Sequence, residues 1–140
     1  QEIPYIAVDA DPTLVALLRK QGRSVYFGDA SRRDVLAAVG AENAAAIVVT
    51  MDRAEAVEHV VASAKAAWSA TPVFARARDA DQARPLREAG ADLASPDTIE
   101  AALQLGEALL NRMGVPDEAA RRIVEERREA ELSKAFYGAR

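Results

Sequence analysis

The sequence predicts an α/β fold, a doubly wound parallel sheet with helices on both faces. Short apolar runs rich in β-branched residues alternate with longer segments of helical periodicity, a pattern typical of strands joined by helical crossovers. The length of 140 residues suits one compact domain. Half of the residues are hydrophobic and only 5% are aromatic, so we expect an aliphatic core.

Composition also excludes several classes of function. The formal charge of −4 argues against a nucleic-acid partner, because phosphate binding needs a basic surface. The absence of cysteine excludes disulfides and thiolate metal sites and fits a cytoplasmic location. No apolar stretch approaches the ~20 residues needed to cross a bilayer, so any membrane part would belong to another segment or chain.

The first predicted unit is a strand over residues 3–9 followed by a helix. Asp11 is placed to cap that helix, Pro12 suits its first turn and Gly22 its end. A second strand is expected at 24–27. The motif Ser31 to Asp34 resembles the capping box of a short helix.

The remaining elements follow the same alternation. Strands are expected at 46–50, at 72–77 and, weakly, at 92–94, and helices at 55–67, 81–90, 98–113 and 117–136. Pro85 conflicts with the helix at 81–90, because it removes a backbone donor and clashes with the preceding turn. That helix is therefore expected to be kinked or to start later.

Candidate ligand-binding residues stand where the first two predicted strands end, because doubly wound folds bind ligands beyond the carboxyl ends of their strands. Asp9 is placed to accept the hydroxyl protons of a ribose, or only to cap a turn. Gly28 and Asp29 can meet an adenine edge, or form an ordinary strand-to-helix turn with Ser31 as the helix cap.

The third and fourth strand ends offer further candidates. Thr50 and Met51 follow the third strand, and Met51 suits either a base or the core. Arg76 and Arg78 are expected on one face of the fourth. They suit an anion or a neighbouring subunit's carboxylates, or internal pairs with Asp79 and Asp81.

Nothing in the sequence requires an enzyme. The single histidine, His59, lies in a predicted helix with no second ligand at metal spacing, so a surface or interface role is expected. The nucleophile, zinc-protease and phosphate-loop motifs are absent. We therefore expect neither a catalytic nor a metal site.

Taken in order, the motifs resemble one family. The chain is similar to the cytoplasmic TrkA-N domain, also called KTN or RCK, of Kef-type potassium–proton antiporters. The likeness covers residues 3 to 114. Its motifs are Val8-Asp9-Ala10-Asp11-Pro12, Val25-Tyr26-Phe27-Gly28-Asp29-Ala30-Ser31, Ile47-Val48-Val49-Thr50, Ala75-Arg76-Ala77-Arg78-Asp79 and the run from Glu88 to Leu103.

The resemblance implies a Rossmann-like domain over residues 1–114 and a C-terminal helical arm over 115–140. It implies binding of NAD(H) or AMP and a homodimer beneath the membrane transporter domain of the full-length protein, at the cytoplasmic face of the bacterial inner membrane. An ancillary flavoprotein is a further implied partner. The implied nucleotide-binding residues include Asp11, and also Asp9 at the ribose, Asp29 and Ala30 at the adenine, Thr50 and Met51 along the cleft, and Arg76 near the nucleotide or the dimer face.

Two departures from the family pattern change these expectations. The family begins with a strand and a glycine-rich phosphate-binding turn, and residue 1 corresponds to a position after that unit. Without that strand the sheet should divide into two halves with unpaired edges, unless another chain supplies the strand or the halves rearrange. Glutathione control in the family uses an arginine and an asparagine, where this chain has Pro96 and Glu131; this argues against glutathione regulation.

Two other functions remain open from the sequence. One is a fragment of an NAD(P)-dependent oxidoreductase, since such enzymes share the fold. The other is a dimerisation domain without a ligand. Its partner-facing arm would be the charged helix at 117–136, which equally suits a solvated helix with intrahelical ion pairs.

Overall fold

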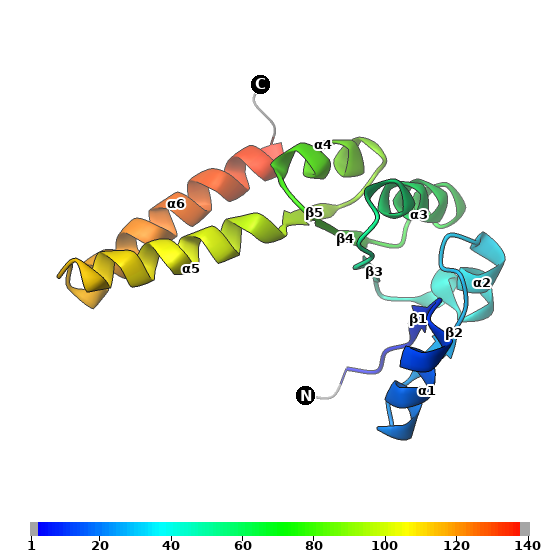
Figure 1. The fold of residues 1–140 in the computed structure, drawn as a ribbon. Coiled ribbons are helices and arrows are strands. Elements are labelled where there is room, and N and C mark those ends of the chain that lie inside the picture. Colours follow the sequence, from blue (N-terminus) through cyan, green and yellow to red (C-terminus); the bar gives the residue numbers. More distant parts are fainter. Residues whose placement is uncertain (1–2, 138–140) are drawn as a thin grey trace.

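A computed structural model describes residues 3–137 and contains alternating strands and helices (Figure 1). Each predicted strand and helix is present, with bounds shifted by a few residues. No helix in this part of the chain is long and apolar enough to span a membrane. In chain order the elements are β1 (Ala7–Asp9), α1 (Pro12–Lys20), β2 (Val25–Phe27), α2 (Arg33–Ala38), η1 (Ala41–Asn43), β3 (Ile47–Val49), α3 (Ala54–Ala67), β4 (Val73–Ala77), α4 (Ala80–Glu88), β5 (Leu93–Pro96), α5 (Asp97–Arg112) and α6 (Asp117–Tyr137).

The strands form two separate parallel sheets, as the sequence predicted. One sheet pairs β1 with β2, and the other has the order β3-β4-β5. Figure 1 shows the first sheet and α1, in blue, set apart from the green second sheet. The strand expected over residues 3–9 is regular only from Ala7 to Asp9, where β2 supplies a hydrogen-bonding neighbour.

The main core lies over the three-stranded sheet. Helices α3 and α4 pack against each other and against β4. Val57 and Val61 on α3, Val73 on β4 and Leu86 on α4 are completely buried. Burying a side chain of this size stabilises the fold by roughly 1.5–3 kcal/mol, so this region is the most stable part of the molecule.

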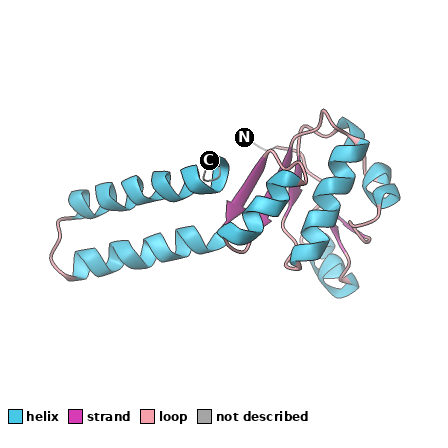
Figure 2. Cartoon of the chain, turned by 90° about the horizontal axis from the view of Figure 1, so that it is seen from above, coloured by secondary structure: helices cyan, strands magenta, loops and turns pink. Residues whose placement is uncertain are grey.

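Helices α5 and α6 form a hairpin that extends away from the strands (Figure 2). Ala120 and Val124 on α6 are buried. Arg128 donates to Glu100 on α5 at 2.8 Å and also pairs with Glu125 on its own helix. The charged helix thus carries the predicted intrahelical ion pairs and folds back onto α5. The last three residues of the expected arm, 138–140, lie outside the described residues.

One local prediction was wrong, and one of two alternatives for another element was excluded. Ser31 does not cap α2, which begins after Arg32 without a side-chain cap, because Ser31 donates its hydroxyl to Asp29 instead. The helix containing Pro85 does not start late. It begins at Ala80, where the Asp79 side chain accepts from the Gln82 amide and caps the first turn.

Candidate functional site

The turn after β1 is built by two aspartates with different tasks. Asp9 is half-buried, and its Oδ1 accepts the amide hydrogen of Asp11 at 2.8 Å. Asp11 accepts from the amides of Thr13 at 2.8 Å and Leu14 at 3.1 Å, and is therefore the predicted cap of α1. Asp9 does hold its turn, as one interpretation expected, but its Oδ2 has no hydrogen bond among those described. The carboxylate of Asp9 can therefore still accept from a ligand.

The turn after β2 presents a third carboxylate. Asp29 is exposed, and its Oδ1 accepts from the Ser31 hydroxyl at 2.6 Å and the Ser31 amide at 2.9 Å. These bonds, the hydroxyl first, lower the pKa of Asp29, and the charges of Arg32 and His59 add to the effect. Asp29 is therefore an oriented, ionised acceptor at neutral pH.

Packing explains why residue 28, in the same turn, is a glycine. A Cβ built at this position would lie 2.8 Å from Val35 Cγ1 of α2 and 3.5 Å from Val8 Cγ1 of β1. Glycine is required here because α2 crosses close to the end of β2. Its presence is no independent sign of a ligand.

Asp9 and Asp29 lie at the same edge of the two-stranded sheet. Asp9 is in register with Phe27, and the Gly28 amide donates to the Asp9 carbonyl at 2.9 Å. Because the strands are parallel, both carboxylates follow the carboxyl ends of adjacent strands. The structure therefore places Asp9 and Asp29, two of the three acidic residues that the sequence selected, at one edge of the sheet.

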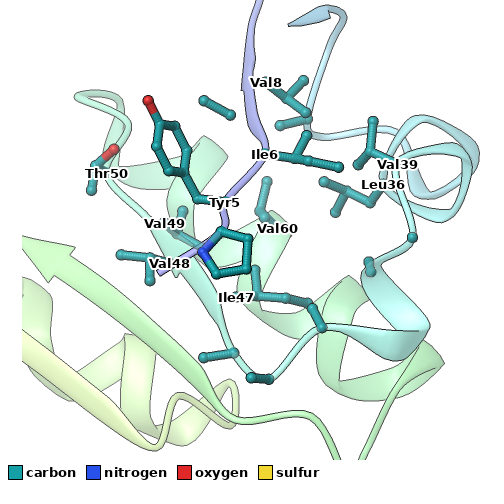
Figure 3. Close-up of a pocket in the computed structure, with 18 of the residues that line it drawn as sticks. Tyr5, Ile6, Val8, Leu36, Val39, Ile47, Val48, Val49, Thr50 and Val60 are labelled. Carbon is teal, nitrogen blue, oxygen red and sulfur yellow. The ribbon is translucent and has the colours of Figure 1, made fainter. Parts of the chain in front are cut away.

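Thr50 lies across an apolar cleft from β1 (Figure 3), and Met51 also lines this cleft. The cleft has a volume of about 740 Å³ and is lined from both sheets, with Ala30 among its residues. Met51 and Ala30 are partly buried and pack against the main core, so Met51 contacts both the core and the cleft. Thr50 is exposed.

Arg76 forms ion pairs that the sequence did not predict. Its guanidinium contacts Asp52, just after β3, and lies 3.2 Å from Asp97 at the start of α5. Arg76 therefore makes internal ion pairs, as one interpretation expected, but with Asp52 and Asp97 and not with Asp79 or Asp81. Sequence alone did not reveal Asp97 because it reaches Arg76 through the pairing of β4 with β5.

The neighbouring arginine is placed differently. Arg78 is exposed and lies 3.4 Å from Asp79, which is one of the expected internal pairs. Asp81 instead lies 3.9 Å from Arg84. In the described part of the chain no group of three or more histidine or acidic residues is arranged to hold a metal ion. The site therefore consists of an acidic rim on β1 and β2, an apolar cleft, and a charged cluster around Arg76 on the other sheet.

Comparisons with known proteins agree with this architecture. Residues 1–95 match the TrkA-N domain. The chain is 34% identical over 113 residues to the glutathione-regulated potassium-efflux system protein KefC of Klebsiella pneumoniae, which covers 81% of this chain and 18% of that protein. Across the curated relatives the chain spans 11–20% of their length.

Solved structures show the same fold. The AMP-bound Kef C-terminal domain of Shewanella denitrificans superposes with a TM-score of 0.78 at 23% identity and covers 94% of each chain. The GsuK channel bound to NAD has a TM-score of 0.67 at 22% identity, over 72% of this chain and 18% of that one. The fold is thus Rossmann-like, and the chain belongs to the TrkA-N domain family.

Proposed function

We propose that this chain is the regulatory domain of a potassium efflux antiporter and that it binds an adenine nucleotide, AMP or NAD(H), at the acidic rim of β1 and β2. In this proposal the domain lies on the cytoplasmic side of a membrane and transport belongs to the membrane part of the full-length protein. Its function is to report nucleotide occupancy, which requires no catalysis.

One observation carries the proposal: the carboxylates of Asp9 and Asp29 follow adjacent strands at one edge of a parallel sheet. A carboxylate in the position of Asp9 can accept hydrogen bonds from both ribose hydroxyls. Asp29 can accept from the exocyclic amine of adenine, with the backbone of Ala30 beside it. Two negative charges at this rim also disfavour a phosphate on the ribose.

The structures named above support an adenine nucleotide as the ligand. One neighbour carries AMP and another carries NAD, and these ligands share an adenosine moiety. The rim residues have groups suited to adenosine. Arg76 is the candidate for a phosphate or for a carboxylate of a second subunit, because its side chain remains 38% exposed despite its two ion pairs.

The proposed mechanism also requires that the domain forms a dimer. Leu105 and Leu109 on α5 and Met113, directly after its end, follow one another at intervals of four residues and are 75%, 59% and 72% exposed. Such a stripe on one helical face suits a second copy of the domain. A nucleotide gates transport in this scheme only by binding one dimer arrangement more tightly than the other.

Calorimetric titration of AMP, NAD and NADH tests nucleotide binding. We expect saturable binding of at least one of them, and Asp9→Ala should weaken it by about tenfold or more, which corresponds to about 1.4 kcal/mol for the lost hydrogen bonds. Asp117→Ala is the matched control, because it removes an exposed carboxylate at the start of α6. No binding of any of the three nucleotides would contradict the proposal.

A further inference from the structure

The C-terminal end of α1 carries three cations that the proposed function does not use. Arg19 and Lys20 lie in its last turn, and Arg23 follows after Gly22. Gly22 has a φ of +78°, which suits a helix-ending turn. In this turn the Gly22 amide donates to the Arg19 carbonyl, and the Arg23 amide donates to the Leu18 carbonyl, each at 3.0 Å. Arg23 is thereby held beside the last turn, and we call Arg19, Lys20 and Arg23 the basic patch.

The basic patch lacks acidic partners in the described part of the chain. Its three side chains are exposed, and none of them forms an ion pair with another residue that the structure describes. The helix dipole favours cations in the last turn of a helix, which accounts for Arg19 and Lys20. Arg23 lies beyond the helix. The charge of the patch is therefore available to an external anion.

The basic patch and the acidic rim lie at opposite ends of α1. The helix begins directly after Asp11, and its nine residues separate its two ends by about 14 Å. At the far end the Ala7 amide donates to the Ser24 carbonyl at 2.8 Å, so the patch adjoins the amino ends of β1 and β2. The Debye length at physiological salt is about 8 Å. The patch is therefore a local positive surface, although the whole chain has a formal charge of −4.

An aromatic ring lies beside the basic patch. The guanidinium carbon of Arg19 is 5.9 Å from the centroid of the Tyr26 ring, within the range of a cation–π interaction. Tyr26 belongs to β2, and its side chain is 49% exposed. Figure 1 shows β2 and α1, in blue, at one extremity of the molecule. Cations beside an exposed, amphipathic ring are typical of surfaces that contact the membrane–water interface.

The surface around the basic patch offers no enclosure for a small ligand. The cleft between the sheets and the groove between α4, α5 and α6 are lined by other residues. A small molecule needs a concave site that covers most of its surface, whereas an extended anionic surface can neutralise separate, exposed cations. A nucleic acid is disfavoured, because three cations neutralise few phosphates and the rest of the chain is acidic.

We infer that the basic patch docks on an anionic lipid surface, with lipid phosphates as its counter-charges and Tyr26 at the level of the headgroups. The inference rests on the proposed function only in placing the domain beside a membrane. Each cation near an anionic leaflet strengthens binding by about fivefold, which corresponds to about 1 kcal/mol. Three cations thus give weak, salt-sensitive docking, and the acidic rim at the other end of α1 stays open to a nucleotide.

Cosedimentation with lipid vesicles tests the inference in the absence of nucleotide. The probes are vesicles of phosphatidylcholine alone and vesicles in which a third of the lipid is phosphatidylglycerol. At low salt we expect at least about tenfold stronger binding to the anionic vesicles. This preference should disappear in about 1 M salt, where the Debye length is about 3 Å. Because no nucleotide is present, the result is independent of whether the acidic rim binds AMP.

Two triple variants locate the effect. Replacing all three residues of the basic patch by glutamine, which retains helix propensity, should reduce binding to the level of the neutral vesicles. The matched control removes the same charge from exposed positions of the α5–α6 hairpin, by Arg112→Gln, Arg121→Gln and Arg122→Gln, and should preserve binding. Equal binding to both kinds of vesicle, or equal loss in both triple variants, would overturn the inference. Release of the chain from the vesicles by oligoglutamate or DNA at equal charge concentration would overturn the assignment to lipid.

Discussion

The two sheets differ sharply in how well they are packed. Beneath α3 and α4, the three-stranded sheet contributes to a cluster in which Val57, Val61, Val73 and Leu86 are completely buried. The two-stranded sheet with α1 buries only Val15 and Val25, while Tyr26 and Phe27 are 49% and 65% exposed. Stability is therefore concentrated in the part of the molecule that does not contain the acidic rim.

This difference places the candidate binding residues on the less stable region. Segments with few buried apolar contacts open at a lower free-energy cost than the core. Asp9 and Asp29 belong to such a segment, so binding a ligand there would order it. A regulatory domain can use this arrangement, because a ligand that stabilises one state shifts the population towards it.

The largest expected effect is the loss of core volume beneath α4. Leu86→Ala should lower the free energy of unfolding by about 2–5 kcal/mol, because it leaves a cavity at a fully buried position. Leu17 on α1 is 53% exposed, so Leu17→Ala should lower the free energy of unfolding by about 0.5 kcal/mol or less. Urea unfolding of both variants measures the contrast, and equal losses would contradict the difference between the regions.

A smaller effect is expected where α2 crosses the acidic rim. Gly28→Ala should destabilise the chain by about 1–3 kcal/mol, because the new Cβ would lie 2.8 Å from a methyl group of Val35. The double variant with Val35→Ala should recover part of this loss. Thermal unfolding measures both variants, and the absence of any recovery would contradict the packing explanation of Gly28.

The third prediction concerns the link between α3 and β4. Asp92 accepts from the Val73 amide at 2.7 Å and from Lys65 at 3.1 Å, and these contacts lower the pKa of Asp92. Asp92→Ala should lower the free energy of unfolding by about 1–2 kcal/mol at pH 7, because it leaves the Val73 amide without this acceptor. Asp34→Ala, which removes an exposed ion pair with Arg32, should cost less than about 0.5 kcal/mol.

The pH dependence of Asp92 has a defined sign. Because its pKa is lower when folded, the carboxylate stabilises the fold above its unfolded pKa of about 3.9, and this contribution is lost as the pH falls through the folded value. The difference in the free energy of unfolding between Asp92→Ala and the unchanged chain should therefore become smaller below about pH 4. A difference that stays constant from pH 7 to pH 3 would contradict this role of the carboxylate.

The sequence predicted the elements well because their signals are local. Asp11 and Pro12 start α1 as expected, and apolar periodicity located α3 and α5. Ser31 was misassigned because its hydroxyl had two possible partners, the α2 backbone and Asp29, and only the folded turn decides between them. A one-dimensional pattern cannot resolve such competition.

The candidate site was predictable only in part. The strand-end rule located Asp9 and Asp29 at one rim because each follows its own strand directly. The partners of Arg76 were not predictable, because Asp52 and Asp97 lie far from it in sequence and meet it through strand pairing. The division into two sheets was expected, because the sequence departs from the family pattern at its first strand.

Hydrogen exchange with and without saturating AMP tests the central claim most directly, since it reports which part of the chain the nucleotide orders. We predict slower exchange at the two strand-end turns, residues 8–11 and 28–31, and no change along α6. Protection confined to the α5–α6 hairpin, or none anywhere, would contradict an adenosine site at the acidic rim.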